Sequence, residues 1–182
     1  IKRFKFNTDL FQKLSEIGLF KKAENVDLFE GQIYETPTKT ANQQKTTQYL
    51  TSKLSDTFKA NIIVTGNISI NFDNLNNWKP DISILRFQAD FYKQSHPKAA
   101  DILLIIEVAD STVEYDRTIK FPKYAAAKIP EAWLINLEAE RIEVHSIPKE
   151  NTYGMVKIYQ RGEEVLSETM PELKLNTDDI LG

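Results

Sequence analysis

The stretch LLIIEVADSTVEYDRTIK, residues 103–120, joins a buried-strand pattern to charged residues that a buried strand should not carry. Its first half is aliphatic on both alternating faces, which predicts a strand covered by packing on both sides. Because side chains alternate with a period of two, Glu107 shares a face with Leu103 and Ile105 and is expected to point into packing or a cleft. An unpaired carboxylate there would be costly or would stay protonated. The fold must therefore supply a group that compensates Glu107.

Asp81 is the first group that could meet Glu107, because it opens the neighbouring strand candidate. It lies on the parity of Ser83 and Leu85. Two carboxylates that converge at strand ends repel each other, and a divalent cation relieves the repulsion. A ligand set made only of oxygen atoms suits Mg²⁺ or Mn²⁺. The pair therefore predicts a metal site.

Lys120 is the second candidate partner, in a helix predicted over residues 113–128. At about 100° per residue, Asp116, Lys120 and Tyr124 fall on one stripe, so the helix can deliver an ammonium toward the carboxylates. Pro122 removes a backbone hydrogen bond from this helix and predicts a kink that affects how Lys120 is aimed. Metal ions and a lysine meet the needs of phosphodiester hydrolysis, which requires neutralisation of developing charge and an oriented water molecule.

The rest of the chain predicts a mixed α/β order around this segment. A short helix is expected with Thr8 as its cap and Gly18 just past its end, and residues 71–80 are expected to be a loop. A hairpin turns at Glu30 and Gly31. The other predicted elements are a helix at 40–59 and strands at 61–70, 80–85, 101–108, 131–137, 141–147 and 153–160. This order predicts a mixed β-sheet flanked by helices, in a single domain that spans residues 1–182.

Composition excludes several classes of site. The chain of 182 residues has no cysteine, which rules out disulfides, thiol catalysis and thiolate zinc sites. With two histidines and no GxSxG motif, a serine-hydrolase triad is not expected. None of the six glycines forms a phosphate-cradling loop or a dinucleotide fingerprint. The net charge of −3 neither excludes nor establishes contact with a phosphate backbone through one local face.

No stretch of the sequence suggests a membrane-spanning segment or a signal peptide. The longest uninterrupted aliphatic run, residues 102–106, is far too short to cross a bilayer. The amino terminus has basic residues but no apolar stretch of the signal-peptide type. A cytoplasmic protein without membrane contact is therefore expected.

Four segments in this order resemble a known family. KPDISIL, IIEVADST, YDRTIKFPKYAAAKIPEAWLINLEAERIEVH and the earlier VDLFEGQIYE are similar to the Uma-type family of restriction endonucleases, a branch of the PD-(D/E)XK nuclease superfamily. The resemblance covers about residues 8–180, and its most specific part is residues 101–136. It implies a restriction-endonuclease-like fold and metal-dependent hydrolysis of nucleic acid, with DNA as the expected substrate. A homodimer is also expected, because a symmetric pair most simply cuts both strands.

The resemblance also implies roles for individual residues. Asp81 would be the aspartate of the PD motif and Glu107 the acid of the next strand, both binding Mg²⁺ or Mn²⁺. The carbonyl of Val108 would be an additional metal ligand. The superfamily usually has its lysine at position 109, where this chain has Ala109. In the family that it resembles, the following helix supplies the lysine, which is Lys120 here.

Accessory positions follow from the same comparison. Asp27 in the hairpin would be the accessory acid, one methylene shorter than the usual glutamate. Asp116 would be the aspartate one turn before the lysine. Gln43 stands where the family usually has a histidine, and Ala109 with Asp110 replaces its usual serine-proline. These departures motivate an alternative function, a non-catalytic module on this fold that binds nucleic acid or another protein.

Simpler interpretations stand beside the functional ones. Glu107 and Lys120 could form a structural ion pair, and Asp116 could serve only to orient the lysine. Tyr124 is expected mainly to pack in the core, and Asp27 could be a solvated strand residue. The polar face of the helix at 40–59 could contact DNA backbone, but is expected to be solvated; its members are Gln43, Gln44, Lys45, Gln48 and Lys53. Both histidines, His96 and His145, are expected at the surface, and both tryptophans, Trp78 and Trp133, in packing.

Overall fold

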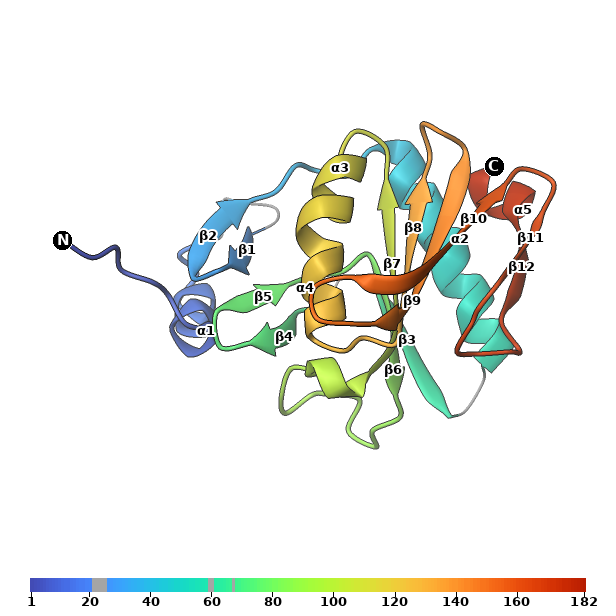
Figure 1. Cartoon of the computed structure of the whole chain (residues 1–182). Coiled ribbons are helices and arrows are strands. Elements are labelled where there is room, and N and C mark those ends of the chain that lie inside the picture. The colour runs from blue at the N-terminus through green and yellow to red at the C-terminus, as the bar shows by residue number, and fades with distance from the viewer. Residues whose placement is uncertain (21–25, 59–60, 67) are drawn as a thin grey trace.

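A six-stranded mixed sheet forms the centre of the computed structural model, which describes residues 1–20, 26–58, 61–66 and 68–182 (Figure 1). Its strands follow the order β10-β9-β8-β7-β6-β3. β7 and β8 are parallel, and every other neighbouring pair is antiparallel. The strands are β3 (Ile62–Gly66), β6 (Ile82–Arg86), β7 (Ile102–Ala109), β8 (Glu131–Asn136), β9 (Arg141–Pro148) and β10 (Tyr153–Gln160).

A smaller antiparallel sheet of four strands, ordered β2-β1-β5-β4, lies beside the central sheet (Figure 1). Its strands are β1 (Val26–Phe29), β2 (Gln32–Glu35), β4 (Ile70–Asp73) and β5 (Asn76–Trp78). A third sheet pairs β11 (Glu164–Leu166) with β12 (Lys174–Asn176). This arrangement confirms the predicted fold class, a mixed α/β protein with helices flanking a mixed sheet.

Helices cover both faces of the central sheet. The helical segments of the described residues are α1 (Thr8–Glu16), α2 (Ala41–Phe58), the 3-10 turn η1 (Ala99–Asp101), α3 (Val113–Tyr115), the π-helical segment η2 (Asp116–Lys120), α4 (Phe121–Ala126) and α5 (Thr177–Leu181). One core cluster joins α2 and α5 to one face of the sheet, and a second joins α4 and the small sheet to the other face. In the part of the chain described, no helix is both long and apolar enough to cross a membrane.

Strand β7 is buried on both faces, as its sequence predicts. Leu104, Ile106 and Val108 pack in the cluster that includes α2, whereas Ile105 and Ala109 pack in the cluster that includes α4. The predicted position of Leu103 is wrong, because it packs on the α2 side. The pairing of β7 with β6 shifts register near this residue, so the simple alternation of faces does not extend to the start of the strand.

The hairpin β1–β2 forms as predicted. Glu30 and Gly31 both adopt positive φ, at 50° and 77°, which matches the tight turn that favours the right-handed twist of a hairpin. A Cβ on Gly31 would also lie 2.8 Å from the Cβ of Lys5. Glycine is therefore required here both for backbone conformation and for the close approach of the amino-terminal segment.

Several predicted boundaries are wrong for identifiable reasons. The single strand expected at 61–70 is divided between β3 and β4, which belong to different sheets. The expected loop at 71–80 contains the β4–β5 hairpin, where Asn76 Nδ2 donates to Asp73 Oδ1 at 2.8 Å. Asn7 rather than Thr8 caps α1, accepting a hydrogen bond of 2.8 Å from the backbone of Leu10. The pattern also failed to reveal β11, β12 and α5.

The helix predicted over residues 113–128 ends at Ala126 and is irregular at its centre. Residues 116–120 form a π-helical turn in which the N–H of Phe121 donates to the carbonyl of Asp116. Pro122 follows in the first turn of α4. The expected distortion at this proline therefore takes the form of a widened turn just before it, a type of irregularity common at functional sites.

Arg117 fastens this widened turn to the central sheet. Its guanidinium bonds both oxygens of Glu143 on β9, at 2.6 and 3.2 Å. Arg141 and His145 contact the same carboxylate at 3.0 and 3.3 Å. Burial alone would raise the pKa of Glu143, but the hydrogen bonds from His145, Arg117 and Arg141 lower it from 4.5 to about 2. The ionised carboxylate therefore stabilises the attachment of the helix.

We predict that Glu143→Gln lowers the free energy of unfolding at pH 7 by about 1–3 kcal/mol, because the charge-assisted hydrogen bonds are lost. A carboxyl group whose pKa is lowered in the folded state stabilises the fold fully above its unfolded pKa near 4.5, and this contribution disappears as the pH falls toward 2. Urea unfolding from pH 7 to pH 3 should show the difference from wild type shrinking at low pH.

Glu164→Gln is the control for this prediction, because Glu164 is exposed on β11. It should change stability by less than about 0.5 kcal/mol at every pH. If the deficit of Glu143→Gln were the same at pH 3 as at pH 7, the ionised carboxylate would not be its source.

Candidate functional site

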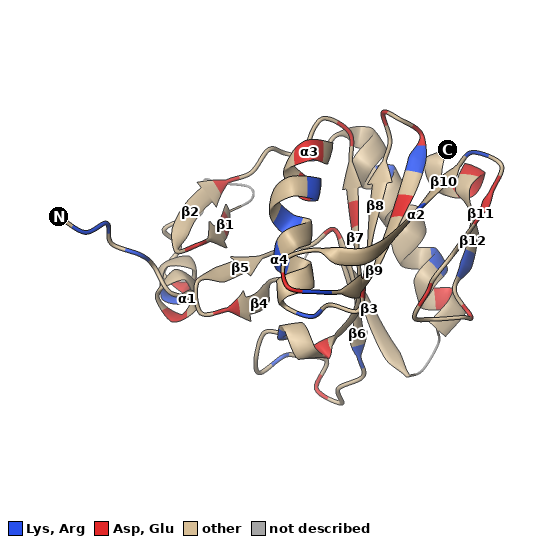
Figure 2. Ribbon diagram, in the orientation of Figure 1, with Lys and Arg blue, Asp and Glu red and all other residues tan. Residues whose placement is uncertain are grey.

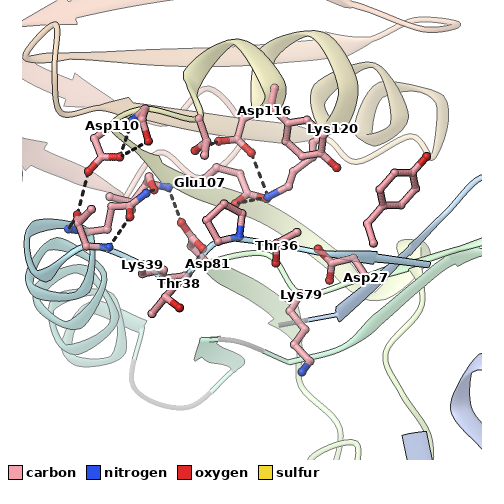
Figure 3. A pocket seen from close by; sticks show the side chains of 18 of the residues that line it. Asp27, Thr36, Thr38, Lys39, Lys79, Asp81, Glu107, Asp110, Asp116 and Lys120 are labelled. Atoms are coloured by element: carbon pink, nitrogen blue, oxygen red, sulfur yellow. Dashed lines mark hydrogen bonds and ion pairs between the residues drawn. The ribbon is translucent and has the colours of Figure 1, made fainter. Parts of the chain in front are cut away.

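A cavity of about 340 Å³ opens where β7 ends and the segment from β2 to α2 passes over the sheet (Figure 3). Six carboxylate residues line it, and four of them are acids that the sequence singled out for the site: Asp27, Asp81, Glu107 and Asp116. Lys39, Lys79 and Lys120 line it as well. The structure therefore brings together the four acids and the lysine that the sequence singled out, although they are up to 93 positions apart, from 27 to 120.

Asp81 and Glu107 meet because of strand register. β6 and β7 are antiparallel with Ile82 opposite Ile106, so the next position places Asp81 opposite Glu107 on the same face. Asp81 Oδ2 accepts a hydrogen bond of 2.7 Å from the backbone N–H of Val108. Asp81 Oδ1 forms an ion pair of 2.6 Å with the ammonium of Lys39. One oxygen of Asp81 thus bonds the backbone near the end of β7, and the other pairs with the ammonium of Lys39.

Glu107 is almost fully buried, with 1% of its surface exposed. Its Oε2 lies 3.2 Å from Lys120 Nζ, and its Oε1 accepts a hydrogen bond from the hydroxyl of Tyr124. Burial raises the pKa of Glu107 to about 8, and the nearby charge of Asp81 also raises it, while Lys120 acts in the opposite direction. The carboxylate is thus in a setting where any further positive charge would stabilise its ionised form.

Lys120 lies between two carboxylates. Its Nζ is 3.2 Å from Glu107 and 3.0 Å from Asp116 Oδ1. Thr112 donates a hydrogen bond of 3.1 Å to the other oxygen of Asp116. Burial alone would lower the pKa of Lys120, but the charges of Glu107, Asp116 and Asp81 raise it well above its usual value. Lys120 is therefore held as an ammonium, and Asp116 contacts it as an i,i+4 partner on the widened turn.

Tyr124 supports Glu107 from beneath and does not line the cavity. It is fully buried, donates to Glu107 and accepts a hydrogen bond of 3.0 Å from the indole N–H of Trp78. Tyr124 therefore packs in the core, as expected, and also makes a polar contact that the sequence did not predict. Trp78 is likewise buried, on β5.

Asp27 enters the cavity from β1 (Figure 3). It is 9% exposed, so the interpretation of Asp27 as a solvated strand residue is wrong. Burial raises its pKa to about 6, against the lowering effects of the Lys120 charge and of a hydrogen bond from the backbone of Lys79. The hairpin therefore delivers a partly desolvated carboxyl group to the same space as Lys120.

Gln43 is also buried, which contradicts its expected place on a solvated helix face. Its Nε2 donates to the carbonyl of Val108 at 3.0 Å, and its Oε1 accepts from the N–H of Thr40 at 2.8 Å. The other polar residues predicted for this face, Gln44, Lys45, Gln48 and Lys53, are exposed as expected. Gln43 thus fixes the start of α2 against the end of β7.

The atoms at the cavity that could bind a metal ion are oxygen atoms of carboxylates and of a backbone carbonyl, the ligands that Mg²⁺ or Mn²⁺ prefers. Among the described residues, no group of three or more acidic or histidine side chains is arranged to hold a metal ion. Two carboxylates and a backbone carbonyl are the set that the sequence predicts, and Asp81 Oδ1 already binds the positive charge of Lys39. The chemistry of Asp81 and Glu107 therefore fits a divalent cation.

Sequence reasoning missed Lys39, whose ammonium reaches Asp81 from the segment before α2. A single lysine in a loop carries no pattern, so only the folded chain could reveal this contact. The expected surface position of His145 is also wrong, since it is 8% exposed and packs against the ring of Phe121 at 4.6 Å between centroids. His96 is half-buried, away from the cavity.

The buried ion pairs of Lys120 predict that removing the lysine alone destabilises the fold more than removing the lysine and Glu107 together. We expect Lys120→Met to lower the free energy of unfolding by about 2–4 kcal/mol, because Glu107 and Asp116 lose their counter-charge. The double variant Lys120→Met with Glu107→Gln should recover part of this loss, since fewer uncompensated carboxylates remain. Urea unfolding of the two variants measures the difference.

Lys79→Met is the matched control, because Lys79 lines the same cavity while its side chain extends away from the carboxylates (Figure 3). It should cost less than about 1 kcal/mol. Equal losses for Lys79→Met and Lys120→Met would contradict a specific role of Lys120 as the counter-charge.

Comparisons with known proteins agree with this architecture. The sequence matches the Uma2 family, described as "Putative restriction endonuclease", over residues 9–178. A crystal structure from Anabaena variabilis ATCC 29413, described as "a putative nuclease belonging to DUF820", has a TM-score of 0.69 and 16% identity, with 86% of this chain and 89% of that chain covered. At this identity the similarity establishes a shared fold. No curated protein matches the sequence. Because the family match spans residues 9–178 of 182, the protein belongs to the Uma2 family.

Proposed function

We propose that this protein is a metal-dependent endonuclease that hydrolyses phosphodiester bonds in nucleic acid. The observation that carries the proposal is the convergence of Asp81, Glu107 and Lys120 on one cavity from two neighbouring strands and a crossing helix. Membership of a family described as restriction endonucleases supports the reaction class. Among the described residues that line the cavity there is no histidine or cysteine.

Asp81 and Glu107 are the proposed metal ligands, and the carbonyl of Val108 is a proposed additional ligand. When bound there, Mg²⁺ or Mn²⁺ would neutralise charge on the phosphate and lower the pKa of a bound water molecule. Gln43 donates to the Val108 carbonyl, which has a second lone pair left for a ligand. Val108 N–H fixes the orientation of Asp81, so one contact positions the acid and the backbone at once.

Lys120 has the proposed role of orienting the attacking water molecule and offsetting negative charge in the transition state. Its place between Glu107 and Asp116 keeps it protonated, which suits an electrostatic role. Asp116 positions the ammonium from one turn away, and Tyr124 positions Glu107 through its hydroxyl. Asp27 is the proposed accessory acid, close enough to Lys120 for their charges to interact.

DNA is the proposed substrate, because the family is described as "Putative restriction endonuclease" and restriction endonucleases as a class of enzyme cut DNA. Cutting both strands would require two sites, which a symmetric homodimer provides. Light scattering coupled to size-exclusion chromatography would measure the mass in solution, and a single-chain mass of 21.0 kDa with and without DNA would contradict the dimer.

We predict that the protein nicks supercoiled plasmid in Mg²⁺ or Mn²⁺, and that Asp81→Ala and Lys120→Ala each reduce the rate by at least about 100-fold. Conversion of supercoiled DNA to open-circular DNA on an agarose gel measures the activity. Labelled single-stranded RNA in parallel tests the choice of DNA.

Lys174→Ala is the control for charge alone, because Lys174 is exposed on β12 and does not line the cavity. It should cut at the wild-type rate. Nicking by Lys120→Ala at the wild-type rate would identify a contaminating nuclease and defeat the assignment.

A second candidate is the non-catalytic module that binds nucleic acid or protein. One observation favours it: protein groups already contact all four carboxylate oxygens of Asp81 and Glu107, as a structural ion-pair network would have them. Calorimetric titration with Mn²⁺ separates the two functions. The nuclease predicts binding that Asp81→Ala abolishes, whereas the module predicts no binding to wild type.

A further inference from the structure

Lys39 occupies the one oxygen of Asp81 that the sheet does not use. Its Nζ lies 2.6 Å from Asp81 Oδ1, while Oδ2 accepts the hydrogen bond from Val108 N–H. The Lys39 side chain is 27% exposed and that of Asp81 is 9% exposed, so this pair is more accessible than the pair of Lys120 and Glu107, at 14% and 1%. Lys39 therefore neutralises Asp81, which the proposed reaction needs as a metal ligand.

The segment that carries Lys39 is held in place from both sides. Thr40 N–H donates to Gln43 Oε1 at 2.8 Å, and Thr40 Oγ1 donates to Asp110 Oδ2 at 2.9 Å. Gln44 Nε2 donates to the Lys39 carbonyl at 3.1 Å. These bonds hold the backbone next to Lys39, whose side chain lies beside Asp81 (Figure 3).

The cavity as a whole favours additional positive charge. Six carboxylate side chains and three lysines are among its lining residues: Asp27, Glu35, Asp81, Glu107, Asp110 and Asp116 with Lys39, Lys79 and Lys120. A divalent cation at Asp81 Oδ1 would gain from this excess of negative charge. However, it cannot share that oxygen with an ammonium 2.6 Å away, because the two cations would repel and occupy the same space.

We propose that Lys39 is an exchangeable counter-cation of Asp81. A divalent cation displaces the ammonium from Asp81 Oδ1, and Lys39, from the wall of the same cavity, then binds a phosphate of the nucleic acid. This inference rests on the proposed function. It adds to the site a second lysine, Lys39, which pairs with Asp81 before the metal binds and with a phosphate of the substrate afterwards. Lys120 has no such freedom, because two buried carboxylates retain it.

The first test is the affinity for Mn²⁺ of the full chain, measured by calorimetry. Lys39→Gln should bind Mn²⁺ roughly three- to tenfold more tightly than wild type, because the competing ion pair is gone. The matched variant Lys79→Gln removes a charge from the same cavity without removing that ion pair, and should change the affinity by about twofold or less. Lys39→Arg keeps a competing cation and should bind no more tightly than wild type.

The second test is the salt dependence of duplex DNA binding with Mn²⁺ present, in a Lys120→Ala background, for which the proposed mechanism predicts cutting at least about 100-fold slower than wild type. Adding Lys39→Gln should reduce the slope of log K against log salt by about 0.9, the loss of one phosphate contact. Circular dichroism and thermal melting establish that each variant is folded before either measurement.

The outcomes separate the two proposals. If Mn²⁺ binds wild type and is lost in Asp81→Ala, but Lys39→Gln and Lys79→Gln bind it equally, the exchange is wrong while the metal site stands. If affinity rises in Lys39→Gln and the salt slope does not change, the phosphate contact is wrong. If Mn²⁺ does not bind wild type, the proposed metal-dependent nuclease fails and the role of Lys39 fails with it.

Discussion

The ion pair between Glu107 and Lys120 is the interaction on which the organisation of this protein depends. Glu107 lies near the end of the apolar strand β7 and is almost fully buried, so without a partner it would strongly favour the protonated form. Lys120 supplies the counter-charge only if the crossing helix packs in one orientation. The salt bridge from Arg117 to Glu143 on β9 secures that orientation, so the central sheet and the helix constrain each other. The charges of the molecule are distributed over many elements, but these few are buried together (Figure 2).

A chain of hydrogen bonds carries this constraint into the smaller sheet. Trp78 on β5 donates to Tyr124 on α4, and Tyr124 donates to Glu107 on β7. Strand β5 of the small sheet, strand β7 of the central sheet and helix α4 are therefore connected through the hydroxyl group of Tyr124. Because all three side chains in this series of hydrogen bonds are buried, the position of Glu107 is set by the packing of the core as well as by its own strand. Such support is what a site needs if its acids are to keep their places when substrate binds.

The register of β6 against β7 fixes the position of Asp81, as the hydrogen bond from Tyr124 fixes that of Glu107. Its hydrogen bond to Val108 N–H joins β6 and β7 at the point where regular pairing ends, and leaves one oxygen for a cation. Lys39 binds that oxygen from a segment held by Gln43 and Asp110. Both are positions at which the resemblance to the family predicts other residue types. Gln43 and Asp110 are connected through Thr40, and both line the cavity.

The sequence by itself determined the central strand, the helix after it and the presence of an acid in an apolar setting. These are local properties, since periodicity and the cost of burying a charge can be read from neighbouring residues. It also indicated Asp81 and Lys120 as partners of Glu107, because strand parity and helical spacing restrict where side chains point. Only the tertiary structure decided that Asp27 is buried at the cavity and not solvated, that Gln43 is buried, and that Lys39 binds Asp81. Those contacts join segments far apart in the chain, and their geometry depends on how sheets and loops pack, which no short pattern encodes.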